Sequence, residues 1–164
     1  METFEINVEY GAEPDRVMAA FWDLEDWPAV APHVRAIEML YGDDQAQVLI
    51  MQVATKQKLD AFKSVRIKQR DTIFYFQPAP PPLLRTHYGS WRFVATTNGT
   101  TVISQHTVDI NTDAARSFLG NVEVHVQDAC GVQQQVINLI RNNSLQTMLA
   151  LKKRLEQTNG GTYA

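Results

Sequence analysis

The longest regular pattern in the sequence is a helical one near its C-terminus, over residues 129–157. Apolar residues recur there at the spacing that gathers them on one stripe of a helix: Val136, Ile137, Ile140, Met148, Leu151 and Leu155. A long helix with one apolar stripe has to be covered by another layer of structure. Asn159-Gly160-Gly161 predicts the end of the helix.

Polar side chains interrupt this stripe. Gln133, Ser144 and Thr147 fall within it, and Asn143 lies at its edge. A helix packed only against a core would carry Leu or Ala at these places, so the polar residues favour a helix that lines a cavity. The alternative is that their side chains bond to the backbone of the helix itself. Their grouping on one stripe favours contact with a ligand.

The residues before this helix read mainly as strands. Phe4, Ile6, Val8 and Tyr10 alternate with polar residues, which is typical of a half-buried strand. Two short helices are predicted, one starting near Pro14 and one around Trp27-Pro28. The segment QPAPPPLL is predicted to be a stiff loop, because proline lacks an amide donor. Further strands are predicted at 34–41, 45–54, 59–70 and 72–77.

This order of elements predicts an α+β fold, in which a curved antiparallel sheet wraps around the long C-terminal helix and encloses a cavity. We expect one domain over residues 1–164, with a core of about 3–158 and a flexible tail at 159–164. Residues 111–128 are expected to be a variable connection.

Composition excludes several partners and compartments. The chain has 15 basic and 18 acidic residues and no long basic run, so nucleic acid is not an expected partner. No apolar run is long enough to span a membrane and no signal-peptide pattern opens the chain, so we expect no membrane. The single cysteine, Cys130, excludes an internal disulfide and fits the cytoplasm. It reads as a small helix residue.

A hairpin around Asn98-Gly99 brings a histidine to the interior. This dipeptide is a strong signal for a two-residue hairpin loop. Pairing Thr97 with Thr100 sets Trp91 opposite His106, on the face that also carries Phe93. His106 is then either a satisfied buried histidine or, because its pKa is near neutrality, a group that moves protons.

The other three histidines are weaker candidates. His87 shares the inward parity of Trp91 but is predicted to lie too far along the strand to act with His106. His33 and His125 are predicted to be exposed.

Arg66 is the most informative charged residue. Phe62, Ser64 and Arg66 share one face of a predicted strand, because side chains alternate along it. Val65 and Ile67 offer a rival apolar face, so alternation alone favours an arginine in solvent. An inward guanidinium would instead offer five donors and a fixed charge to a bound ligand.

Four segments resemble the START-like helix-grip (SRPBCC) superfamily and, within it, the bacterial polyketide aromatase/cyclases. They are PDRVMAAFWDLEDWPAVAP, FKSVRI, SWRFVATTNGTTVISQH and INLIRNNSLQTMLALKKRLEQ, in the family order. The resemblance implies that Ser64-Val65-Arg66 is the Ser-x-Arg pattern of the family's pocket arginine, which would turn Arg66 inward. It also implies aldol cyclisation and dehydration of a poly-β-ketone chain, delivered by an acyl carrier protein.

These observations define a candidate site. Arg66 is expected to stabilise an enolate and His106 to carry protons. A ketosynthase complex is a further expected partner, and the protein is expected to be a monomer or a homodimer. The residues expected to contact substrate are Trp27, Phe62, Ser64, Tyr88, Trp91, Phe93, Asn143, Ser144 and Thr147.

No cofactor or metal is expected. The sequence has no His-Glu-x-x-His, no Cys-x-x-Cys, no glycine-rich phosphate loop and no Gly-x-Ser-x-Gly. Glu123, His125 and Asp128 do not have the spacing of a metal site.

Two other functions remain open, because a fold does not determine its chemistry. The same cavity could carry or sense a hydrophobic small molecule such as a lipid, a quinone or an aromatic polyketide, without catalysis. A third possibility is a degenerate domain that helps a synthase complex to assemble.

Overall fold

The computed structural model describes residues 1–54, 59–120 and 129–157, which form one antiparallel sheet and four helices. The predicted tail at 159–164, its glycine stop, and His125 lie outside the described residues. The elements are β1 (Glu2–Tyr10), α1 (Pro14–Trp22), α2 (Trp27–Val30), β2 (Val34–Gly42), β3 (Ala46–Ala54), β4 (Leu59–Gln69), β5 (Thr72–Ala79), β6 (Leu84–Thr96), β7 (Gly99–Ile110), α3 (Thr112–Gly120) and α4 (Ala129–Gln157).

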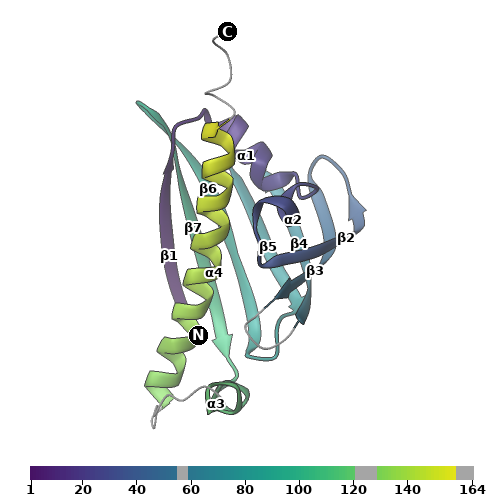
Figure 1. The fold of residues 1–164 in the computed structure, drawn as a ribbon, viewed down its shortest axis with the longest axis vertical. Helices are drawn as coiled ribbons and strands as arrows, with labels where there is room; N and C mark the ends of the chain where they lie inside the picture. Colours follow the sequence, from purple (N-terminus) through teal and green to yellow (C-terminus); the bar gives the residue numbers. More distant parts are fainter. Residues whose placement is uncertain (55–58, 121–128, 158–164) are drawn as a thin grey trace.

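The seven strands follow the order β1-β7-β6-β5-β4-β3-β2. Each strand from β2 to β7 pairs with its neighbour in sequence, and β1 completes the sheet by pairing with β7. The helix α4 lies along one face of this curved sheet, with α1 near its C-terminal end and α3 near its N-terminal end (Figure 1). The predicted α+β helix-grip architecture is confirmed.

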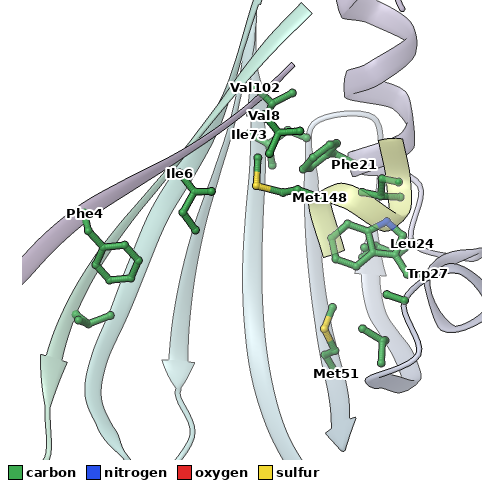
Figure 2. Packing of buried hydrophobic residues seen from close by; sticks show 14 of the residues in the cluster. Phe4, Ile6, Val8, Phe21, Leu24, Trp27, Met51, Ile73, Val102 and Met148 are labelled. Carbon is green, nitrogen blue, oxygen red and sulfur yellow. The ribbon is translucent and has the colours of Figure 1, made fainter. Parts of the chain in front are cut away.

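The core lies between the sheet and the helices. Figure 2 shows Ile6, Val8, Ile73 and Val102 projecting from the strands on the side where Phe21 and Met148 lie. Phe21 is fully buried and meets the ring of Phe93 edge-on at 5.2 Å. None of the helices in the described ranges has the length and hydropathy of a membrane span.

The predicted pairing of β6 with β7 is wrong by two residues. The loop is Thr97-Asn98, and Gly99 belongs to β7, where it pairs with Thr96. Gly99 has φ of 149°, and a Cβ there would lie 2.0 Å from the carbonyl oxygen of Tyr10. Its missing side chain therefore lets β1 approach closely. A shift of two keeps each residue on its predicted face but changes its cross-strand neighbour.

Two predicted loops contain regular structure. The strand β5 continues through Pro78 to Ala79, because Pro78 falls where the β4–β5 register shifts and no ladder donor is needed. The helix α3 occupies part of the predicted variable connection, whose residues 121–128 are outside the described ranges. Asn111 starts this helix by accepting the Ala114 amide at its side-chain oxygen, at 3.3 Å.

Candidate active site

A cavity of about 190 Å³ lies between the sheet and the helices. Its wall is mainly apolar and aromatic, with a few polar groups that converge on it, which is typical of a site for a small organic ligand. Nine of the residues predicted from sequence belong to this wall: Trp27, Phe62, Ser64, Arg66, Trp91, His106, Asn143, Ser144 and Thr147.

Two predicted contact residues lie elsewhere. Tyr88 is 40% exposed on the outer face of β6, because it alternates with the inward His87 and Gly89, so its prediction as a cavity residue is wrong. Phe93 is buried, but it packs on Phe21 in the core and is absent from the cavity wall.

Arg66 points into the interior and is 3% exposed. Its Nη1 donates to the side-chain oxygen of Gln47 at 2.9 Å and to the main-chain oxygen of Trp22 at 3.4 Å. Its Nη2 donates to the main-chain oxygen of Phe21. Phe21 and Trp22 end α1, so the guanidinium satisfies two carbonyls at the negative end of that helix.

The charge of Arg66 is stabilised without an ion pair. Within the described ranges, no ion pair between Arg66 and a carboxylate is found. The rings of Trp22, Trp27 and Trp91 lie 5.3–5.7 Å from its central carbon. Burial lowers the pKa of Arg66 to about 9, so the group stays protonated at neutral pH. Its Nε is buried and has no hydrogen-bond partner among the residues that the structure describes.

One row of residues crosses six strands and carries most of the polar chemistry. The register pairs Gln47 with Arg66, Arg66 with Tyr75, Tyr75 with Gly89 and Gly89 with His106. Phe4 of β1 completes the row opposite His106. Cross-strand neighbours share a face of the sheet, so these residues all turn toward the cavity side.

His106 is held on both sides of its ring. Its Nδ1 lies 2.7 Å from the hydroxyl of Tyr75. Its Nε2 lies 3.0 Å from Ser104 Oγ and 3.1 Å from Ser144 Oγ, which connects β7 to α4. The ring of Phe4 lies 5.0 Å away in a nearly parallel plane. The imidazole therefore has a fixed position and orientation.

His87 also belongs to this cluster, so the prediction that it lies too far from His106 is wrong. Its Nε2 is 3.1 Å from His106 Nδ1 and 3.3 Å from the hydroxyl of Tyr75. Its Nδ1 is 2.9 Å from the side-chain oxygen of Gln77. The error follows from the shifted register: His106 faces Gly89, two residues from His87, rather than Trp91.

Burial keeps both imidazoles neutral. It lowers the pKa of His87 to about 4. It also lowers the pKa of His106, to about 3, and the nearby His87 and Arg141 add to this shift. Burial raises the pKa of Tyr75 well above its ordinary value. The cluster is therefore a neutral hydrogen-bonded network at physiological pH.

Gly89 makes room for this network. A Cβ at Gly89 would lie 1.9 Å from the main-chain oxygen of Gln105 and 2.6 Å from the hydroxyl of Tyr75. We expect Gly89→Ala to lower the free energy of unfolding by about 1–3 kcal/mol, because backbone has to move. Denaturant titration measures this change, with Gly120→Ala as a control, since no atom of the described residues lies within 4 Å of a Cβ added there. Equal stability of both variants would contradict the prediction.

Several cavity residues were not predicted from sequence. Gln47 and Tyr75 share the inward face of their strands with the buried residues Leu49 and Ile73, two positions away, so that parity was a usable signal. His33 is half-buried, which makes its predicted exposure wrong. It contacts Thr147 at 2.9 Å across to α4, and burial lowers its pKa.

Thr147 tests the alternative that the polar side chains of α4 bond to the backbone of the helix itself. Its hydroxyl donates to the main-chain oxygen of Asn143 at 3.2 Å, in addition to its contact with His33. The backbone-bonding alternative therefore holds in part for Thr147, although its side chain still belongs to the cavity wall. Cys130 is exposed. Across the described residues, no group of His, Cys, Asp or Glu is arranged to hold a metal ion.

Solved structures share this fold over nearly the whole chain. The di-domain ARO/CYC StfQ from the steffimycin biosynthetic pathway matches with a TM-score of 0.85 and 23% identity, over 96% of this chain and 52% of its own. The di-domain ARO/CYC BexL from the BE-7585A biosynthetic pathway matches with a TM-score of 0.81 and 27% identity, over 93% of this chain and 49% of its own. The chain thus spans about half the length of each of these two proteins.

A third structure is similar in length to this chain. The Zhui aromatase/cyclase from Streptomyces sp. R1128 matches with a TM-score of 0.77 and 18% identity, over 95% of this chain and 94% of its own. No curated protein sequence matches the chain. The family model described as "Polyketide cyclase / dehydrase and lipid transport" matches residues 10–129, which is more than half of the sequence. The chain therefore belongs to the polyketide cyclase/dehydrase and lipid transport family.

Proposed function

We propose that the protein is a polyketide aromatase/cyclase. Its substrate is a poly-β-ketone chain on an acyl carrier protein, with a ketosynthase complex as the source of that chain. It closes one ring by an intramolecular aldol reaction and then removes water to give an aromatic product.

One observation carries this proposal: the charged Arg66 lines the same cavity as the neutral, hydrogen-bonded side chains of His106, His87 and Tyr75. Tyr75 lies between Arg66 and His106 in the cross-strand row. The guanidinium and the imidazole therefore face the same cavity. A fixed cation stabilises the enolate oxygen that develops when a methylene between two ketones loses its proton. The proposed base is His106, which is neutral at pH 7, although burial places its pKa at about 3, below the near-neutral value expected from the sequence.

The cavity supplies the other part of the catalysis. A flexible poly-β-ketone chain can close rings at several positions, and a shaped wall holds one carbanion against one carbonyl. Such positioning contributes on the order of 7–11 kcal/mol to lowering a barrier. Carbon–carbon bond formation leaves an alkoxide, which takes the proton held by His106 and becomes a hydroxyl. His106 then removes a second proton from the carbon next to the one that bears this hydroxyl and gives that proton to the hydroxyl, which leaves as water. Arg66 acts chiefly by its charge, since three of its five N–H donors are bonded to the end of α1 and to Gln47.

The test is product analysis in a reconstituted synthase. A ketosynthase with malonyl-loaded acyl carrier protein makes the poly-β-ketone, with and without this protein. We expect the protein to replace a mixture of spontaneous products by one ring pattern. An unchanged product mixture, with a protein whose circular dichroism shows it to be folded, would refute the proposal.

A carrier of hydrophobic molecules is the second candidate. The mainly apolar wall and the commitment of the Arg66 terminal nitrogens to α1 favour binding without chemistry. Quenching of Trp27 and Trp91 fluorescence measures binding of a fatty acid, a quinone and an aromatic polyketide. Tight binding of the first two, together with indifference to the polyketide and no change in ring pattern, would favour the carrier.

A further inference from the structure

A chain of hydrogen bonds runs along the cavity wall from Gln77 to Ser144 through two imidazoles. Gln77 contacts His87, His87 contacts His106, and His106 contacts Ser144, at 2.9, 3.1 and 3.1 Å. Gln77, His87 and His106 are 8%, 8% and 4% exposed. A neutral imidazole has one N–H and one bare nitrogen, so the polarity of one link determines the polarity of the next.

The geometry of the central link is that of a directed N–H···N bond. The ring centroids of His87 and His106 are 5.4 Å apart and their planes differ by 24°. With the two nitrogens 3.1 Å apart, the rings meet edge to edge in nearly one plane. One of the two nitrogens has to carry the hydrogen, because two bare nitrogens would repel each other.

The side-chain oxygen of Gln77 sets the direction of this bond. An amide oxygen only accepts, so His87 carries its hydrogen on Nδ1 and its Nε2 is bare. His106 then carries its hydrogen on Nδ1, and its bare Nε2 accepts from the hydroxyls of Ser104 and Ser144. Tyr75 shares the His106 N–H as an acceptor and donates to the main-chain oxygen of Gln105 at 3.3 Å.

We propose that Gln77 and His87 are positioning residues, which fix the tautomer of His106 so that its basic Nε2 faces Ser144 and the cavity. This inference rests on the proposed function, because it assigns His106 the role of the base in ring closure. If Gln77 presented its NH₂ group to His87 instead of its oxygen, donor and acceptor would exchange places at each link, and His106 would present an N–H to the cavity. His106 would then be a donor and not a base.

The tautomer can be measured without any substrate. Long-range ¹H–¹⁵N correlation spectra of the protein labelled with ¹⁵N-histidine report which nitrogen of each imidazole carries hydrogen. At pH 7 we expect His87 and His106 both to carry it on Nδ1. A wild-type His106 with its hydrogen on Nε2 would overturn the inference, whatever the activity of the protein.

Variants test the direction of control. In Gln77→Leu, His87 loses its acceptor, so we expect the His106 hydrogen to move from Nδ1 to Nε2. In His87→Gln, the oxygen of the new side-chain amide can still accept from His106 Nδ1. His106 should therefore keep its wild-type tautomer in this variant. Tyr88→Leu is the matched control, because Tyr88 is next to His87 but lies on the outer face of the sheet. An unchanged tautomer in a folded Gln77→Leu would contradict the inference.

Kinetics separate this inference from the proposed function. We expect Gln77→Leu to lower kcat for ring closure at least about 10²-fold with little change in KM, as a wrong histidine tautomer does elsewhere. If the wild-type protein closes no ring, the proposed function fails and the tautomer measurement still decides the inference. If it closes the ring while His106 holds its hydrogen on Nε2, the proposed function survives and the inference fails.

Discussion

Arg66→Met is expected to lower the rate of ring closure at least about 10²-fold, because it removes the fixed positive charge beside the developing enolate. Methionine fills much of the space among Trp22, Trp27 and Trp91, so the cavity wall is retained. The rate of formation and the ring pattern of the aromatic product in the reconstituted synthase are the measurements.

The same substitution removes the guanidinium donors from the end of α1. Because the Phe21 carbonyl loses its Arg66 donor and the Trp22 carbonyl keeps only the Gln47 amide at 3.1 Å, we expect the free energy of unfolding to fall by about 1–3 kcal/mol. Gln47→Leu separates the two effects, since it removes one partner of Arg66 but leaves the charge in place. Arg92→Met, on the exposed face of β6, is the control. A folded Arg66→Met variant with the wild-type rate and ring pattern would exclude a catalytic role for Arg66.

Acid is expected to destabilise the fold before most carboxylates titrate. In the unfolded chain His87 and His106 take up protons near pH 6.5, whereas burial holds their native pKa values at about 4 and about 3. Between these limits the unfolded state binds more protons than the native state. The free energy of unfolding therefore falls as the pH decreases from 7 to 4.5, by several kcal/mol in total.

Denaturant titrations at intervals across this pH range measure the effect. A His87→Gln, His106→Gln double variant should show a much flatter dependence, because neither side chain titrates there. His33→Gln is the matched single control, since its lowered pKa comes from partial burial at the other side of the cavity. A wild-type curve as flat as that of the double variant would contradict the neutral cluster.

The fold was predictable because the signals for it are local. Alternation in residues 4–10 and helical spacing in 129–157 each involve neighbours along the chain, and both elements are found. The inward side of β4 was not decided by alternation, because Val65 and Ile67 form an equally apolar face. It took the resemblance to the family's Ser-x-Arg pattern to predict that Arg66 turns inward.

The site was less predictable because its geometry depends on register. An error of two residues in one hairpin left His106 on the correct face but separated it from His87. The cause was Gly99, whose close approach to Tyr10 comes from a strand nearly ninety positions away in the sequence. The half-burial of His33 depends in the same way on Thr147 of α4. These are tertiary contacts between residues far apart in the sequence, and they produce no periodic pattern from which they could be predicted.

The row that runs from Gln47 to Phe4 has a practical meaning for redesign. Each of six strands contributes one position to this row. Arg66, Tyr75 and His106 therefore lie at the same level along the strands, and His87 lies two residues away from it. The pairs Leu49–Ser64 and Met51–Phe62 occupy the next two levels and carry no charge. Met51 and Phe62 lie furthest from this row, so substitutions there could reshape the cavity for longer or shorter ligands while the row itself is left unchanged.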